Sequence, residues 1–374
     1  MWQATSRVAH IERLALLSRA ETNDSGLSRR WPFAAIRPGF GRAASECVRS
    51  PYTNVIKVAE TDSRTDFPYL SDAAACRAQA LFAARDYAGL EEMFEAAGTG
   101  VDFAGNLSMA PLRAGLADFF EYGPHSVETN LGRLVDWRRA FPESVLVGPL
   151  EAEVFSAWAW QARGTGFARD VTPQAWQLYS YRNMMARAAL DSGGDSVRSP
   201  LWYQAWLDIS VDTSTDQEEL LAKFAEAEAL YPRYYALHRA VIRSLLPRWG
   251  GSHEDVMDFI DDQVRKAPAA ERDVLYARLI WAYVDMESTE SNVFRRPIGA
   301  PDWSKLQRGF ATLLERYPDS DYLLNGFARI ACSADSFQDY RQLRPQLEAR
   351  KSATAWTIET TREVCDKKLL PRTE

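Results

Sequence analysis

Apolar residues recur three and four positions apart along most of this chain, which is the spacing of one face of an α-helix. Ala78, Leu81 and Phe82 precede a short polar turn, for example, and Leu90 and Phe94 follow it at the same spacing. Alanine, leucine, glutamate and arginine dominate these runs, and no alternating run of β-branched residues stands out. The pattern therefore predicts a nearly all-α fold.

The predicted helices are separated by turns and by two longer polar inserts, 164–172 and 287–301, which we expect to be loops. Thr215 and Glu218 have the spacing of a capping box at the start of one helix. The expected helical ranges are 73–83, 86–97, 107–122, 127–141, 147–163, 173–190, 200–211, 216–230, 233–246, 252–266, 269–286, 303–317, 320–333, 337–350 and 355–364.

Three helical runs close on an aromatic residue followed by proline: Phe141-Pro142, Tyr231-Pro232 and Tyr317-Pro318. Proline has no N–H and blocks helix continuation, so it can end one helix and precede the next. The residues around these corners also match, most closely in the second and third copies. The equivalent positions are Leu220 with Leu306, Phe224 with Phe310 and Leu134, and Leu237 with Leu323 and Val147. The chain therefore contains an internal repeat.

The repeat prolines lie 90 and 86 residues apart, and helix restarts at Pro200 and Pro268 divide these intervals. Two of the resulting pieces are close to the roughly 34 residues of a tetratricopeptide hairpin. We therefore expect an α-solenoid of antiparallel, tetratricopeptide-like helical hairpins. A length of 374 residues with 46% hydrophobic residues and 12 Trp suits such a stack, because its contacts run only between neighbours.

Charge is distributed unevenly along the chain. Residues 1–66 carry 10 Lys and Arg against 7 Asp and Glu, whereas the remainder carries 34 against 44. An acidic body argues against nucleic acid as the main partner, since phosphate binding needs a basic face.

Residues 1–66 lack a sustained helical period, and we expect an irregular, poorly ordered extension before a helical repeat domain at 67–374. No run approaches the roughly 20 apolar residues of a membrane span.

The four cysteines, Cys47, Cys76, Cys332 and Cys365, are dispersed and form no CxxC pair. The four histidines lie near none of them in sequence, so neither a metal nor a cofactor is expected. Cys76 and Cys332 fall in apolar helical runs and are most simply interpreted as buried thiols. A Cys332–Cys365 bridge is the alternative. Because the cysteines are few and dispersed, we expect the protein to be cytoplasmic.

Two glycine-containing turns contain residues that the helical repeat by itself does not explain. In the first, Trp160 and Arg163 run into Gly164 and Gly166. A basic residue and a glycine suit the end of a helix, so structural capping explains them. The alternative is a loop that faces a ligand, although the motif lacks the third glycine and the lysine of a phosphate loop.

The second turn follows Pro247 and contains Arg248, Trp249, Gly250, Gly251 and Ser252. Ser252 is well placed to cap the next helix. The sequence Ser252-His253-Glu254 suggests a hydrolase triad, but adjacent residues in one helical turn point to different faces. We therefore predict no catalytic residue here.

These two turns resemble a bacterial family known as domain of unknown function 4034. The resemblance rests on the Trp160 to Gly166 run continued to Trp176, on Pro232-Arg233-Tyr234, and on the Pro247 to Ser252 turn, and it covers roughly 141–259. It implies a tetratricopeptide-like helical repeat and bacterial origin. It implies no activity.

Three functions remain open from the sequence. The preferred one is a non-catalytic interaction module that binds another protein along its concave face. Exposed aromatic and arginine side chains would then be its hot spots, although for each of them taken singly we favour a place in the core between hairpins. The side chains in question are Tyr179, Tyr181, Arg182, Tyr203 and Tyr235.

The second function is a small-ligand binder or an enzyme, in which the 163–170 and 247–253 turns form one pocket that holds an anion. Asp170 would supply a carboxylate, and Arg163, Arg169, Arg182 or Arg248 would hold the anion. The third is an immunity or adaptor protein whose acidic body binds a basic partner.

Overall fold

The computed structural model describes residues 47–48, 67–99, 109–164, 166–191, 198–287, 289–352, 355–357 and 360–369. Within these ranges the chain forms α-helices and short 3-10 turns and contains no strand, so the all-α prediction is confirmed. The helices are α2 (Phe67–Ala84), α3 (Tyr87–Thr99), α4 (Met109–Tyr122), α5 (Val127–Ala140), α6 (Val147–Arg163), α7 (Pro173–Asp191), α8 (Pro200–Asp212), α9 (Gln217–Leu230), α10 (Ala236–Leu245), α11 (His253–Lys266), α12 (Arg272–Met286), α13 (Glu290–Phe294), α14 (Trp303–Arg316), α15 (Asp321–Ser333), α16 (Phe337–Leu343) and α17 (Arg362–Leu369).

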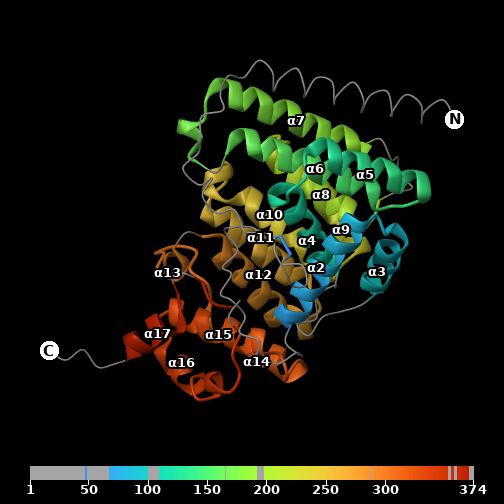
Figure 1. The fold of residues 1–374 in the computed structure, drawn as a ribbon. Coiled ribbons are helices and arrows are strands. Elements are labelled where there is room, and N and C mark those ends of the chain that lie inside the picture. Colours follow the sequence, from blue (N-terminus) through green and yellow to red (C-terminus); the bar gives the residue numbers. More distant parts are fainter. Residues whose placement is uncertain are drawn as a thin grey trace.

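Helices α4 to α12 form two layers, and Figure 1 labels the helices in their chain order. Each even-numbered helix from α4 to α12 contacts the even-numbered helix before it and the one after it, and we call these five helices the inner layer. Helices α7, α9 and α11 each pack against the two inner helices that flank them in sequence. Contacts between successive hairpins are what a helical solenoid requires.

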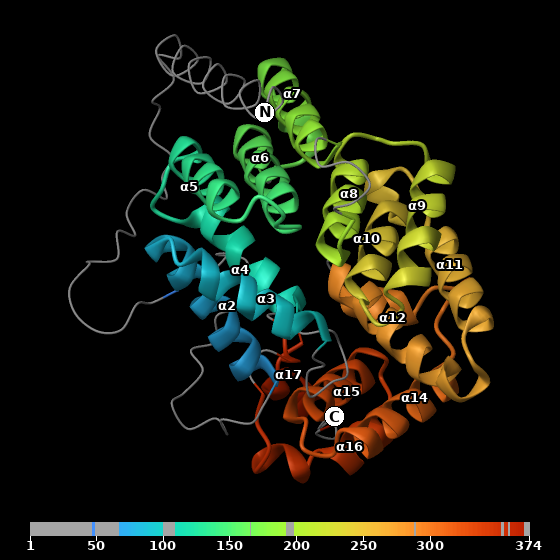
Figure 2. The ribbon, with the colours of Figure 1, turned by 90° about the vertical axis from the view of Figure 1, so that its right-hand side faces the viewer.

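The stack follows a curved path, so that its two ends approach each other (Figure 2). Helices α2 to α4, α5 to α7, α8 to α12 and α14 to α17 succeed one another around this path. Helix α15 contacts α2, which closes the path between the first and the last hairpins.

The three aromatic-proline corners predicted from the repeat have the same geometry. Phe141, Tyr231 and Tyr317 each form the C-cap of a helix with φ between −128° and −134°, and each donates its N–H to the carbonyl four residues earlier. The matched apolar residues around the corners are all buried: Leu134, Val147, Leu220, Phe224, Leu237, Leu306, Phe310 and Leu323. The repeat is therefore a structural unit, with the proline excluded from the helix that it follows.

Several helix ends differ from the predicted ones. Asp216, not Thr215, caps α9, because its carboxylate accepts the N–H groups of Glu218 and Glu219. The predicted 337–350 helix ends at Leu343, two residues before Pro345, and continues as a 3-10 turn. The predicted loop 287–301 contains the short helix α13.

The last predicted helix, 355–364, is wrong. Helix α17 begins at Arg362, where the hydroxyl of Thr361 accepts the N–H of Val364. Thr361 is thus a helix start that apolar periodicity alone did not identify.

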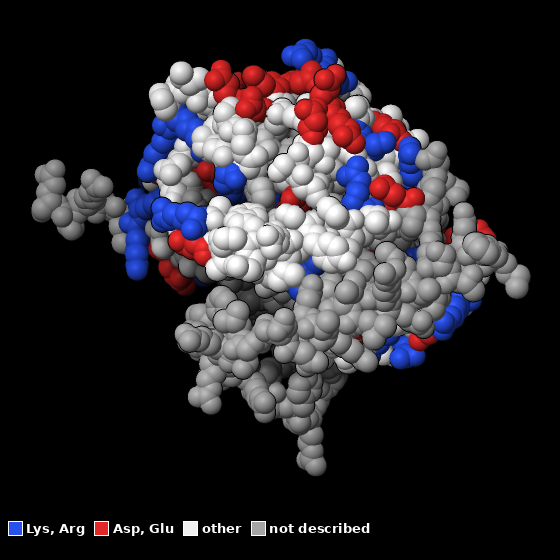
Figure 3. Space-filling view, turned by 90° about the horizontal axis from the view of Figure 1, so that it is seen from above, with Lys and Arg blue, Asp and Glu red and all other residues white. Residues whose placement is uncertain are grey.

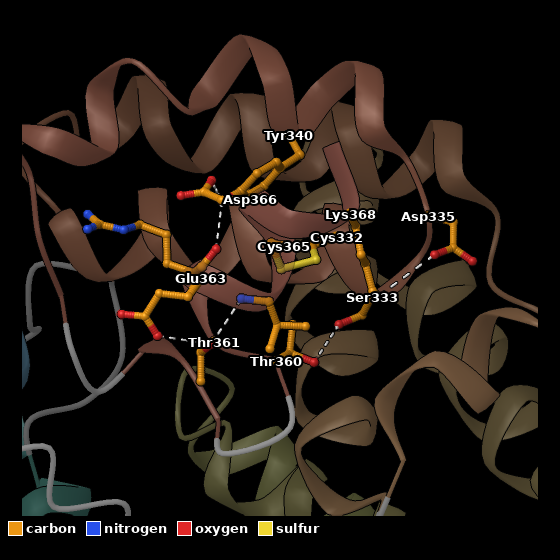
Figure 4. Close-up of a disulfide and its surroundings, with 12 residues drawn as sticks. Cys332, Ser333, Asp335, Tyr340, Thr360, Thr361, Glu363, Cys365, Asp366 and Lys368 are labelled. Carbon is orange, nitrogen blue, oxygen red and sulfur yellow. Dashed lines mark hydrogen bonds and ion pairs between the residues drawn. A yellow bond between two sulfur atoms is a disulfide. The ribbon is translucent and has the colours of Figure 1, made fainter. Parts of the chain in front are cut away.

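Two disulfides replace the free thiols that we expected. Cys47 is bonded to Cys76 on α2, and Cys332 on α15 is bonded to Cys365 on α17. The interpretation of Cys76 and Cys332 as buried thiols is therefore wrong, and the alternative Cys332–Cys365 bridge is present. Figure 4 shows this bond between the two helices, beside the Ser333–Thr360 hydrogen bond.

The first disulfide attaches a part of the N-terminal region to the helical body. Next to Cys47, the backbone of Val48 forms two hydrogen bonds of 2.8 Å with the buried side-chain amide of Gln79. The rest of the predicted irregular extension, 1–46 and 49–66, lies outside the described residues. The domain division at residue 67 stays a prediction.

None of the helices in the described ranges combines the length and the apolar character that crossing a membrane requires.

Candidate functional site

A polar cavity of about 500 Å³ lies against the inner layer, and we call it the inner cavity. Helices α4, α6, α8, α10 and α12 and the 3-10 turn after α10 supply its lining, whereas the outer helices supply none of it. Its ionisable lining residues are Arg113, Glu121, Glu153, Asp208, Asp212, Arg239, Arg243, Arg248 and Asp285.

Ion pairs hold the floor of this cavity. The guanidinium of Arg113 lies 2.7 Å from a carboxylate oxygen of Glu153 and 2.8 Å from one of Asp208. Burial raises the pKa of Glu153, and Arg113 partly offsets that effect. These charges lie on three successive inner helices, so their pairing connects the helices across the cavity.

A second ion pair is centred on Asp212, whose carboxylate is almost fully buried. One oxygen accepts a 2.6 Å hydrogen bond from Arg243, and the other accepts a 3.0 Å bond from the indole of Trp160. Burial raises the pKa of Asp212, while Arg243 and Trp160 favour its charged form. This arrangement fixes Arg243 and Trp160 at the cavity wall.

Arg239 and Arg248 differ from these paired groups. Both side chains are exposed and line the inner cavity, and neither has a hydrogen-bond or ion-pair partner among the described residues. Burial, and then the nearby Arg243 and Arg239, lower the pKa of Arg248, although Glu287 acts in the opposite direction. Three guanidinium groups thus lie close enough to repel one another, which favours an anion between them.

The structure brings part of the two predicted turns together. Trp160 and Trp249 meet edge to face with ring centroids 6.1 Å apart, and Arg243 lies over both rings. Trp160 and Arg248 line the inner cavity.

The remainder of the first turn has structural contacts of its own. Arg163 lies between the rings of Trp160 and Trp176 and donates hydrogen bonds to the carbonyls of Gly164 and Gly166. Gly164 has φ +71° and ends α6. Capping and closure of the turn therefore account for Arg163 and Gly164.

Arg169 and Arg182 do not line the inner cavity. Arg169 is largely exposed and lies over Phe167, with Asp170 3.9 Å away. Arg182 is buried against Trp158, to whose carbonyl it donates a 2.8 Å hydrogen bond. Of the four arginines proposed for an anion pocket, only Arg248 lines it.

The second turn is shaped by its glycines and by Ser252. Gly250 adopts φ +100°, and a Cβ on Gly251 would lie 2.2 Å from the carbonyl oxygen of Leu245. The hydroxyl of Ser252 accepts the N–H of Asp255 and caps α11. These residues therefore shape the turn that carries Arg248 and Trp249.

No triad forms at Ser252-His253-Glu254. The Ser252 hydroxyl donates to Asp255, whereas Nδ1 of His253 lies 2.8 Å from the Tyr283 hydroxyl and its Nε2 lies 3.0 Å from Arg296. Burial and the neighbouring Arg296 lower the pKa of His253.

Most of the candidate hot-spot side chains belong to the interior. Tyr179, Tyr203 and Arg182 are buried, whereas Tyr181 is exposed and Tyr235 lies under the guanidinium of Arg278. Tyr179 and Tyr203 thus fill interfaces between helices.

Sequence reasoning did not identify most of the charged lining. A signal was present in spacing, because Gln204, Asp208 and Asp212 are four residues apart on one helix, as are Arg239 and Arg243 on another. Polar residues at that spacing lie along one helical face. Such a polar stripe on helices otherwise rich in apolar residues is typical of a face that lines a cavity.

On the face seen in Figure 3, described Lys and Arg and described Asp and Glu of both signs surround an uncharged area. In the part of the chain that the structure describes, no three His, Cys, Asp or Glu side chains are arranged to hold a metal ion.

Comparison with known families identifies one segment. Residues 210–282 match the family described as Domain of unknown function (DUF4034). The predicted resemblance to this family is confirmed for the segment from the end of α8 to α12. Arg239, Arg243 and the Arg248-Trp249 turn lie inside the match, whereas Trp160 and Arg163 lie outside it. Comparisons with curated proteins and with solved structures find no match.

Proposed function

We propose that this protein is a non-catalytic, tetratricopeptide-like helical-repeat protein that binds a segment of another protein at the inner cavity. Arg239 and Arg248 would hold a carboxylate of that segment. The observation that carries the proposal is the presence of two guanidinium groups without described partners beside the ion pairs of Arg113 with Glu153 and Asp208 and of Arg243 with Asp212.

The chemistry of the wall favours recognition over catalysis. Guanidinium groups bind carboxylates through two parallel hydrogen bonds, and Arg248 lies near both Arg239 and Arg243. A carboxylate placed there would relieve their mutual repulsion. The buried pairs around Arg113 and Asp212 supply a rigid base, which lowers the entropy lost on binding.

A free small anion is the second candidate. A volume of about 500 Å³ lies within the range of small-molecule pockets, which run from about 300 to 1,000 Å³. An adaptor for a basic partner, the third hypothesis from the sequence, has no comparable support from the inner cavity.

A titration separates the two candidates. The full chain would be titrated with a labelled acidic octapeptide of alternating Glu and Gly and, separately, with glutarate. Protein recognition predicts that the peptide binds at least about tenfold more tightly than glutarate, and a small-ligand site predicts the reverse. Absence of saturation by either probe below about 1 mM would contradict both.

Arginine variants test whether the probe binds in the inner cavity. We expect Arg239→Glu and Arg248→Glu each to weaken the tighter probe by about tenfold or more, because reversed charge repels a carboxylate. Arg341→Glu on α16 is the matched control, since that arginine is exposed and does not line the inner cavity. Equal loss in all three variants would show that the effect is nonspecific.

The cytoplasmic location and the bacterial origin stay predictions. The two disulfides favour an oxidising compartment over the cytoplasm, where such bonds are rare.

A further inference from the structure

A groove on the other side of the molecule, away from the inner cavity, has the character of a second binding site. One part of it lies between α9 and α11, and the other continues past the start of α10 to α12 and to Arg316 at the end of α14. Figure 2 shows α9 and α11 on the outer side of the stack. Two connected hollows of about 310 and 620 Å³ form it, and we call it the outer groove. The two hollows share Ala225, Glu228, Gln263 and Lys266.

The two ends of the outer groove carry opposite charge. Asp255, Asp258 and Asp262 line the smaller hollow, where Asp262 is paired with Arg265 and Lys266. Arg233, Arg278 and Arg316 line the larger one, where Arg316 is paired with Glu271. Asp258 and Arg233 are both exposed, and neither has an ion-pair partner among the described residues. A ligand lying along the groove would therefore meet an acidic end and a basic end.

The basic end lies at the repeat corners. Pro232 and Tyr317, which belong to two successive aromatic-proline corners, line it together with Tyr235. The guanidinium of Arg278 lies 4.8 Å from the ring centroid of Tyr235. Tyrosine and arginine in this arrangement are the residue types enriched where proteins bind one another.

The floor combines apolar side chains with one histidine. Phe224 and Phe259 line the smaller hollow, and His238 lines the larger one between them. His238 is only 2% exposed, and its Nε2 lies 3.1 Å from the carboxylate of Glu228. Its Nδ1 has no hydrogen-bond partner among the described residues. A buried polar atom beside a hollow is a place where a ligand group would gain a hydrogen bond.

The α11 side of the outer groove indicates the length of ligand that would lie along it. Asp255 and Lys266 are eleven residues apart on one helix, which corresponds to about 16 Å at 1.5 Å per residue. An extended peptide covers that length with about five residues, at about 3.3 Å each.

From these observations we infer that the outer groove binds an extended segment of a partner protein, with a basic residue at the Asp258 end and an acidic residue about five positions away at the Arg233 end. Apolar side chains between them contact Phe224 and Phe259. This site is distinct from the inner cavity, because the two share no lining residue. The inference does not depend on the proposed function.

Fluorescence anisotropy with short peptides tests this site. The full chain would be titrated with labelled Lys-Gly-Leu-Gly-Leu-Glu, with the same sequence reversed, and with a version in which Gln replaces both charged residues. We expect one of the two charged peptides to bind more tightly than the other, since the groove has a direction, and the neutral peptide to bind most weakly.

Charge-reversal variants test whether the peptide binds in the outer groove. Asp258→Lys and Arg233→Glu should each weaken the preferred peptide by about two- to tenfold, as expected for reversing one exposed ion pair. Replacing the peptide's Lys by Glu should restore binding to Asp258→Lys but not to the unchanged chain. Such a rescue cannot come from misfolding.

Arg248→Glu is the control, because it alters the inner cavity alone. Undiminished binding of the neutral peptide, no saturation by either charged peptide up to about 1 mM, or failure of the rescue would overturn the inference. Loss of binding in Arg248→Glu with no effect of Asp258→Lys would assign the peptide to the inner cavity instead.

Discussion

Aromatic rings and guanidinium groups alternate around Asp212. Trp160 donates to its carboxylate from one side and Arg243 from another, and Trp249 covers both. Each of these side chains restricts its neighbours, so the wall of the inner cavity is preorganised before any ligand arrives. In the proposed function, the exposed Arg239 and Arg248 are the groups that would hold a carboxylate.

Removing the central carboxylate tests this interpretation. We expect Asp212→Ala to lower the free energy of unfolding by about 3 kcal/mol, because it leaves Arg243 without its close partner and Trp160 without its acceptor. Urea denaturation monitored by circular dichroism measures the change.

Arg139→Ala is the matched control, since its pair with Asp136 is exposed and should contribute less than about 0.5 kcal/mol. The double variant Asp212→Asn/Arg243→Met should recover part of the loss, because no unpaired charge remains. A loss in Asp212→Ala no larger than the loss in the control would show that the pair does not hold the wall.

Close approach between helices is set by small residues. Gly309 on α14 faces α12, and a Cβ there would lie 2.1 Å from the carbonyl oxygen of Asp273. The α12–α14 contact therefore depends on a missing side chain, and it lies in the repeat unit that ends at Tyr317. Gly132 on α5 has no such requirement, since no atom lies within 4 Å of a Cβ built there.

Two alanine substitutions compare a glycine that close helix packing requires with a glycine that has open space around it. Gly309→Ala should destabilise the protein by about 1–3 kcal/mol, because the helices must move apart. Gly132→Ala on α5 has open space around the new methyl group and should stabilise by about 0.5–1 kcal/mol through helix propensity. Thermal or urea unfolding of both variants gives the comparison, and equal effects of the same sign would contradict it.

The contact that closes the curved stack is between two helices, and each disulfide has one cysteine on one of them. Cys76 lies on α2 and Cys332 lies on α15, and these two helices contact each other. The Cys332–Cys365 bond also holds the C-terminal helix α17, which has a single buried residue, Cys365 itself. Cross-linking therefore supplements weak packing where the chain ends.

Reduction should weaken this end of the molecule. The Cys332–Cys365 bond spans 33 residues, so Cys365→Ser should lower the free energy of unfolding by about 2–4 kcal/mol through the added freedom of the unfolded chain. Denaturation with and without a reducing agent checks this expectation, and the variant should keep only the part of the response that comes from the Cys47–Cys76 bond.

Thiol labelling of the untreated protein supplies the control. Alkylation should modify none of the four cysteines before reduction and all of them after reduction under denaturing conditions. Labelling of Cys332 or Cys365 in the folded, untreated protein would contradict a disulfide at this position and would support the predicted cytoplasmic location.

The order of helices, the aromatic-proline corners and the family resemblance followed from the sequence alone. Apolar spacing, proline and helix caps act over a few residues, so a short window of sequence determines them, as the three equivalent corners show. The Thr215 cap and the 355–364 helix were wrong for the same reason, since one neighbouring side chain decides such an end.

Tertiary structure alone decided which charged residues meet. Arg113, Asp208 and Arg243 come from three helices, and their proximity depends on the curvature of the whole stack rather than on any local pattern. The same holds for Cys47 with Cys76 and for the two ends of the outer groove, because contacts between distant segments are set by how the helical hairpins pack on one another.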